Sequence, residues 1–270
     1  MEISKPLFTE ALSAILGVTV KFQSDCKHSD GVIQLDITSL TTIALLGLEA
    51  LSLADQPVSY LTSLLTRLFV GEQKKENTSA SLRDAVFAIP DDFFDPKFDF
   101  DFTDMRESGS DPACTRGDEP YKRPYGWMRF ALKVRDKYPD GNGWLGPDGW
   151  RSRSEPGEWP VSYHGTGLKG AEGIVQTHFR AGGGQAYGRG VYSSPDINMA
   201  EMYAEVGKFK SQKNGKTYRV IMQNRVNPKK REIVDKDIWL VPIPEGTSAA
   251  KEKEIVESSI RPYGLLLKEV

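Results

Sequence analysis

The spacing of apolar residues predicts helices and a short strand near the N-terminus. Two apolar stripes have helical spacing, namely Phe8, Ala11, Leu12 and Ile15, and then Leu61, Leu64, Leu65 and Leu68. Between them, Ile33, Leu35 and Ile37 alternate with polar residues as in a strand. We therefore expect residues 1–75 to form a small, mostly helical unit.

The second half of the chain has the alternation of an α+β protein. Trp127, Phe130, Ala131 and Val134 follow the i, i+3, i+4, i+7 spacing of an amphipathic helix, with basic residues between them. Short strands are predicted at 160–163, Gly190–Ser193, Thr217–Val226, Ile238–Pro242 and 263–268, and further helices at 168–177 and 196–206. Short strands interleaved with helices indicate the α+β class.

An acidic stretch separates these two regions. Residues 91–118 contain nine acidic and three basic residues, a net charge of −6, together with Pro, Gly and Ser. The spacing of a calcium-binding loop is missing, so a solvated acidic linker is the interpretation. The predicted organisation is a helical region (1–75), an acidic linker (76–118) and a folded domain (119–270).

Composition narrows the functional classes. With 270 residues, 39% of them hydrophobic, the chain can bury a core. Its net charge of −2 does not indicate a polyanion-binding protein. Cys26 and Cys114 cannot form a disulfide scaffold, which favours a reducing compartment. The three His residues are scattered and there is no Cys-x-x-Cys, so we expect no metal site.

Export and membrane signals are weak. The most apolar run, 40–54, is shorter than the roughly 20 residues of a spanning helix. Glu10 interrupts the N-terminal apolar stretch, where a signal peptide has no acidic residue. We therefore expect an intracellular protein, in the cytoplasm or nucleus, without a membrane partner.

Candidate chemistry is concentrated in residues 161–206. His164 directly follows a predicted strand, and Gly165 lets a ligand approach the backbone closely. The glycine-rich loop 181–190 fits neither a P-loop nor a dinucleotide-binding turn. Tyr192 and Tyr203, together with His164, would form an aromatic slot with a polar edge, which suits a flat heteroaromatic ring.

This segment resembles the catalytic core of the poly(ADP-ribose) polymerase-like ADP-ribosyltransferases. The resemblance consists of His-Gly-Thr at 164–166, Gly-Arg-Gly-Val-Tyr at 188–192, and Tyr203 eleven residues after Tyr192. Arg180 falls where the family has a basic residue near the adenosine half of NAD. The likeness extends over 119–270 and implies a split, mixed or antiparallel sheet core with flanking helices.

The resemblance also implies the substrate and the site. NAD would be the substrate, with His164 bonded to the hydroxyls of the nicotinamide ribose and the Gly165 backbone bonded to the carboxamide. Tyr192 and Tyr203 would stack on the nicotinamide ring. The remaining contacts to NAD would come from Thr166 and Arg180.

The third catalytic position differs from that of the chain-elongating members, which have Glu. Tyr263 is the best match on the late strand and Ile260 the second, so the catalytic set would be His164, Tyr192 and Tyr263. Such His-Tyr-Tyr variants are associated with transfer of a single ADP-ribose unit. Ala200 replaces a Ser of many members, which removes one hydrogen bond to nicotinamide. The resemblance thus implies a mono-ADP-ribosyltransferase with a protein as acceptor.

Two alternatives stay open. The chain is compatible with an inactive NAD- or ADP-ribose-binding protein. It is also compatible with an RNA 2′-phosphotransferase, whose phosphate would need several arginines, here Arg180, Arg189 and Arg225. The basic residues of 122–137 are interpreted as a solvated face, so a nucleic-acid acceptor is possible but not indicated. The sequence determines neither the acceptor nor the oligomeric state.

Overall fold

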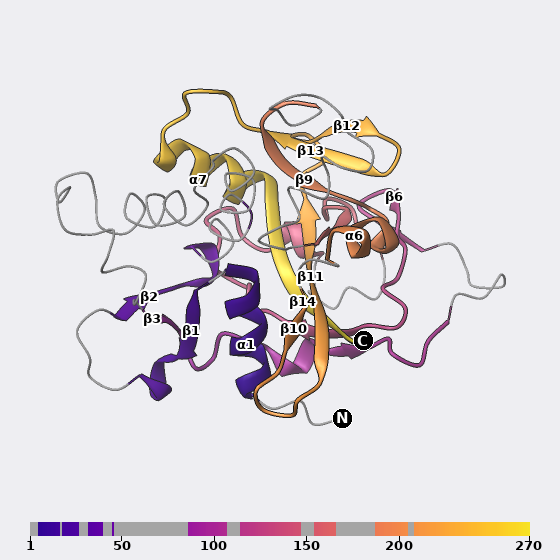
Figure 1. Cartoon of the computed structure of the whole chain (residues 1–270). Coiled ribbons are helices and arrows are strands. Elements are labelled where there is room, and N and C mark those ends of the chain that lie inside the picture. Colours follow the sequence, from indigo (N-terminus) through magenta and orange to yellow (C-terminus); the bar gives the residue numbers. More distant parts are fainter. Residues whose placement is uncertain are drawn as a thin grey trace.

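The computed structural model in Figure 1 is a mixed α+β protein with mostly antiparallel sheets, which confirms the predicted class. The residues it describes are 5–16, 18–26, 32–39, 45, 86–106, 114–146, 154–165, 187–204 and 208–270. Within these ranges, no helix has the length and apolar character required to cross a membrane.

The largest sheet has six antiparallel strands. Five of them are hydrogen-bonded in the order β10 (Phe209–Lys210), β11 (Thr217–Val226), β14 (Ile260–Glu269), β7 (Met128–Ala131) and β4 (Phe100–Asp101). The sixth strand, β8 (Val161–Gly165), pairs with the second half of β11, on the edge where β10 pairs with its first half. The sheet is therefore split along this edge of β11. The predicted bounds of β11 are confirmed, and the strands expected at 160–163 and 263–268 correspond to β8 and β14.

A second antiparallel sheet continues from β8. Its strands are β12 (Glu232–Asp235), β13 (Ile238–Pro242) and β9 (Gly190–Ser193). The observed bounds of β9 and β13 are the predicted ones. Two backbone hydrogen bonds between Tyr163 and Ser194 connect β8 to the chain just beyond β9. Helix α6 (Ile197–Ala204) follows, as predicted, and α7 (Ala249–Ser259) precedes β14. The helix expected at 168–177 lies outside the described residues.

The N-terminal part forms a helix beside a small parallel sheet. Helix α1 (Lys5–Leu16) confirms the first apolar stripe, and the sheet has the order β1 (Thr19–Phe22), β3 (Val86–Ile89) and β2 (Val32–Gln34). Shorter elements in the described residues include a ribbon of β5 (Thr115–Arg116) and β6 (Glu119–Pro120), and the 3-10 turns η1 (Gln23–Asp25), η2 (Pro96–Phe98) and η3 (Gly143–Leu145). The leucine stripe of 61–68 lies outside the described residues, as does nearly all of the apolar run 40–54.

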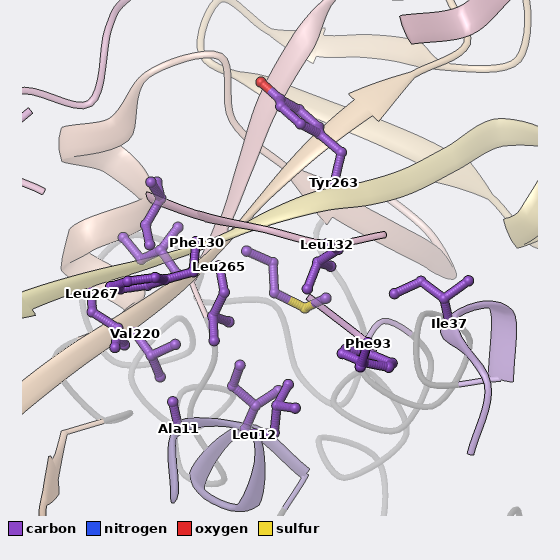
Figure 2. Packing of buried hydrophobic residues seen from close by; sticks show 14 of the residues in the cluster. Ala11, Leu12, Ile37, Phe93, Phe130, Leu132, Val220, Tyr263, Leu265 and Leu267 are labelled. Atoms are coloured by element: carbon purple, nitrogen blue, oxygen red, sulfur yellow. The ribbon is translucent and has the colours of Figure 1, made fainter. Parts of the chain in front are cut away.

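Helix α1 packs into the same hydrophobic core as the large sheet. Figure 2 shows Ala11 and Leu12 of α1 facing Val220, Leu265 and Leu267 of the central strands β11 and β14. Beside them, the Phe8 ring lies 4.4 Å from that of Phe94 and 4.6 Å from that of Phe130. The hydrophobic core therefore has no break at residue 119, where the sequence suggested a domain boundary.

The acidic stretch is also part of the packed structure, in contrast to the expected surface linker. Phe93 and Phe102 are buried, and β4 adds a strand to the large sheet. The carboxylate of Asp99 accepts the backbone N–H of Ala131 on β7. The phenylalanines between the acids supply the apolar surface, and the acids stay at the rim of the core or bond the backbone.

The predicted helix around residues 127–134 is wrong. Residues Met128–Ala131 form β7, whose backbone pairs with β14 on one side and β4 on the other. The apolar residues of the stripe are indeed buried, but Arg129, assigned to a polar face, is buried as well and donates to the carbonyl oxygen of Phe98. Hydrogen bonding to a neighbouring strand on both edges stabilises this segment as a strand, although its apolar residues have helical spacing over two turns.

Candidate active site

His164 has a defined tautomer. It lies near the end of β8, and its Nδ1 is 2.6 Å from the backbone carbonyl oxygen of Tyr192 on β9. Because a carbonyl oxygen only accepts, Nδ1 carries the proton and Nε2 of the neutral ring keeps its lone pair. Burial lowers the pKa of His164 below its usual 6.5, and the Tyr192 carbonyl raises it by a smaller amount, so the ring is neutral at pH 7.

The two ring nitrogens of His164 differ in their surroundings. His164 Nε2 is buried and has no hydrogen-bond partner among the described residues. A buried acceptor without a donor is costly, because water cannot replace the missing bond. An unmet acceptor on a buried neutral imidazole is the feature expected where a hydroxyl group binds.

The sheets place His164 beside Tyr192. Tyr163 and Ser194 form two backbone hydrogen bonds with each other, of 2.7 and 2.9 Å. One residue further along β8, the imidazole instead of the backbone makes the contact to the neighbouring strand. The end of β8 that carries His164 and the strand that carries Tyr192 therefore lie side by side.

The glycines before Tyr192 are required by geometry. A Cβ on Gly190 would lie 2.2 Å from the carbonyl oxygen of Val241 on β13, so no other residue fits there. Gly188 has φ +102°, which side-chain-bearing residues rarely adopt. The Tyr192 hydroxyl donates to the Gly188 carbonyl oxygen at 2.6 Å and accepts the Tyr187 N–H at 3.2 Å. The turn thus anchors the phenol of Tyr192.

Tyr203 lies on α6, the helix that follows β9 as expected, and only its backbone is described. Asp196 begins the helix by accepting the N–H of Asn198, while its carboxylate also pairs with Lys122. Ala200 is buried on α6. Thr166 and Arg180, the other two residues expected to bind NAD, lie outside the described residues.

Tyr263 is not brought to His164 and Tyr192. The pairing of β11 with β14 shifts register between Gln223 and Asn224, and Tyr263 is the extra residue of this bulge. Its ring centroid is 5.3 Å from the guanidinium carbon of Arg225. In Figure 2 its hydroxyl points away from Leu265 and from α1.

The buried neighbours of Tyr263 confirm this placement. Burial raises the pKa of Tyr163 well above its usual 10.0, and the nearby Tyr121 and Tyr263 raise it further. Tyr163 and His164 are consecutive strand residues, so their side chains point to opposite faces. Tyr263 therefore belongs to the face of Tyr163, and the expected His-Tyr-Tyr set is not assembled around it. The bulge is the physical reason, because it turns the ring to the opposite face.

Two arginines near the site are already paired inside the molecule. Arg225 is fully buried, with Nη1 3.3 Å from a carboxylate oxygen of Glu158 and 2.5 Å from the Trp159 carbonyl oxygen. Arg189 forms an ion pair with Glu252 of α7. The sequence analysis missed Glu252, although the Ala, Lys and Glu content of 249–259 after Ser248 is typical of a capped helix.

Neither a metal site nor a relative adds to this description. In the part of the chain with described coordinates, no three His, Cys, Asp or Glu side chains form a group that could hold a metal ion. No protein-family model matches the sequence, and no curated protein matches it.

Proposed function

We propose that this chain is an NAD-dependent mono-ADP-ribosyltransferase that modifies a protein acceptor. The observation that carries the proposal is His164, a buried neutral imidazole whose Nδ1 is bonded to the Tyr192 backbone carbonyl and whose Nε2 lacks a partner in the described structure. A lone-pair nitrogen bonded through its imidazole to the strand that carries a tyrosine suits a ligand that has both a hydroxyl group and a flat ring. The nicotinamide riboside half of NAD has both.

The proposed reaction needs positioning more than a covalent nucleophile. The bond between ribose C1′ and the nicotinamide nitrogen breaks, and nicotinamide leaves with the bonding electrons. The acceptor forms a bond to C1′ and releases a proton to solvent. Positive charge develops on the ribose, so a fixed orientation and nearby acceptors lower the barrier. His164 would accept a hydrogen bond from a ribose hydroxyl, Gly165 would bond the carboxamide, and Tyr192 and Tyr203 would stack on the ring.

Transfer of a single unit is the product we propose. Chain elongation requires a carboxylate that aligns an attached ribose hydroxyl and draws off its proton. The strand paired with β9 is β13, and it carries no carboxylate between Ile238 and Pro242. Tyr263 is packed on the other face, so single-unit transfer is supported by the absence of a carboxylate from this apolar strand.

The RNA 2′-phosphotransferase alternative is less favoured. It would recruit Arg189 and Arg225 to a phosphate, yet both are engaged in internal ion pairs, and Arg225 is fully buried. The inactive NAD-binding alternative differs from our proposal only in turnover. We also propose an intracellular location, where the thiol groups of Cys26 and Cys114 would stay reduced.

Incubation of the full chain with labelled NAD and a lysate tests the proposal. We expect labelled protein bands and release of nicotinamide. Loss of a buried hydrogen bond costs about 1–3 kcal/mol, so His164→Ala should lower the rate roughly 5- to 150-fold. Tyr203→Ala should lower it similarly if its ring stacks on nicotinamide.

Ser162→Ala is the matched control, because Ser162 is buried on the same strand two residues from His164. It should keep wild-type turnover. NAD binding without turnover would support the inactive alternative, and wild-type rates in both site variants would refute the site. A ladder of chains on a gel would contradict single-unit transfer.

A further inference from the structure

Arg189, the middle residue of the Gly-Arg-Gly turn, is held by the segment that leads from β13 into α7. Its guanidinium forms an ion pair with Glu252, and its Nη1 donates to the Pro244 carbonyl oxygen at 3.0 Å. The backbone carbonyl oxygen of Arg189 accepts the N–H of Ile243 at 2.9 Å. Three contacts therefore tie one turn residue to a single neighbouring segment.

The ion pair is sheltered enough to stay formed. The side chain of Glu252 is 6% exposed and that of Arg189 is 27% exposed. A carboxylate so deeply buried is stable only with a partner. One turn further along α7, Val256 packs in a buried cluster with Val191 of β9. The same face of α7 thus contacts both the turn and the strand that carries Tyr192.

The turn is also where the Tyr192 phenol is anchored. Tyr192 donates to the carbonyl oxygen of Gly188, the residue directly before Arg189. A shift of Arg189 would move that acceptor, and with it the ring of Tyr192. The ion pair can therefore act on Tyr192 without touching a substrate.

We infer that Arg189 and Glu252 are a positioning pair, through which α7 holds the glycine turn and Tyr192 in place for catalysis. The catalytic consequence rests on the proposed function, whereas the positioning itself does not. A misplacement of about 1 Å can reduce a rate on the order of 100-fold. The charge pair is thus a determinant of activity outside the substrate-binding residues.

The test compares Glu252→Gln, Arg189→Gln and the double variant with Glu254→Gln. Glu254 is the matched control, since it forms an exposed ion pair with Lys251 on the same helix. Each single variant should lose roughly 10- to 100-fold in kcat/KM for NAD, and the double variant no more than the worse single variant, because both remove one interaction. Amide hydrogen exchange of residues 187–193 should rise at least about 10-fold, with exchange in α6 unchanged.

The outcomes separate the two proposals. If the wild-type chain neither binds nor turns over NAD, the proposed function fails and hydrogen exchange alone decides the positioning role. Wild-type exchange at 187–193 in Glu252→Gln would overturn the inference, as would additive losses in the double variant. The double variant leaves no unpaired buried charge, so it provides the readout if a single variant does not fold.

Discussion

His164 gives the folded chain a pH dependence with a definite sign. Burial lowers its pKa in the folded state below 6.5, so the unfolded chain binds the extra proton first as the pH falls. The contribution of the neutral imidazole to the free energy of unfolding is fully present above pH 6.5. It decreases as the pH falls from there through the lowered folded-state pKa. Each unit of pKa difference is worth about 1.4 kcal/mol. We expect the wild-type melting temperature to fall more between pH 7 and pH 5 than that of His164→Gln.

The same protonation should remove activity, because Nε2 would become a donor. Ser162→Ala keeps the imidazole and should show the wild-type pH dependence. A change seen only in His164→Gln is then due to the imidazole and not to the carboxylates, which all three proteins share. Parallel melting curves for wild type and His164→Gln across this range would contradict a buried neutral imidazole.

At the scale of elements, α6 is held to the large sheet by a cluster of three charged residues. Glu201 of α6 pairs with Arg219 of β11 and accepts two hydrogen bonds from Lys268 of β14, at 2.8 and 3.1 Å. All three side chains are at least half buried, so loss of the carboxylate leaves two cations near one another. Glu201→Gln should destabilise the chain by about 1–2 kcal/mol and increase hydrogen exchange in α6.

Glu269→Gln is the comparison for this prediction. Glu269 pairs with Lys216 at the same sheet, but both side chains are about half exposed. Exposed ion pairs contribute little to stability. The free energy of unfolding of this variant, measured in urea, should therefore change by less than about 0.5 kcal/mol. Equal effects of the two substitutions would show that Glu201 does not anchor α6.

At the scale of the whole molecule, the shared core predicts that the C-terminal portion needs α1. A fragment of residues 119–270 would expose the core surface that Leu12 covers in Figure 2, including Leu265 and Leu267. We expect this fragment to aggregate or to unfold at much lower urea than the full chain. Within the full chain, Leu12→Ala should lower the free energy of unfolding by about 2–5 kcal/mol, as truncation of a buried leucine does in other proteins.

Lys21→Ala, at an exposed position of β1, should leave the urea midpoint unchanged. A soluble 119–270 fragment with a wild-type urea midpoint would instead support the sequence-based domain boundary. The acidic stretch before residue 119 belongs to the same test, because β4 and Phe93 lie in the sheet and the core.

The strands of the second half follow from the sequence alone. The bounds of β9, β11 and β13 are those predicted from the sequence. Here local pattern and tertiary structure agree, because these segments are rich in the apolar and β-branched residues that buried strands favour. The meeting of His164 with the Tyr192 strand was likewise expected from the motifs, and the structure brings the two together.

Long-range pairing decided the rest. Residues 127–134 have helical spacing, yet partners on both edges make β7 a strand. Tyr263 has the strand position expected of a site residue, but a bulge opposite Gln223 turns it to the other face. The ion pair of Arg189 with Glu252 joins residues 63 positions apart. Spacing along the chain specifies which residues are apolar, whereas register, bulges and distant charge partners depend on contacts that only the folded chain makes.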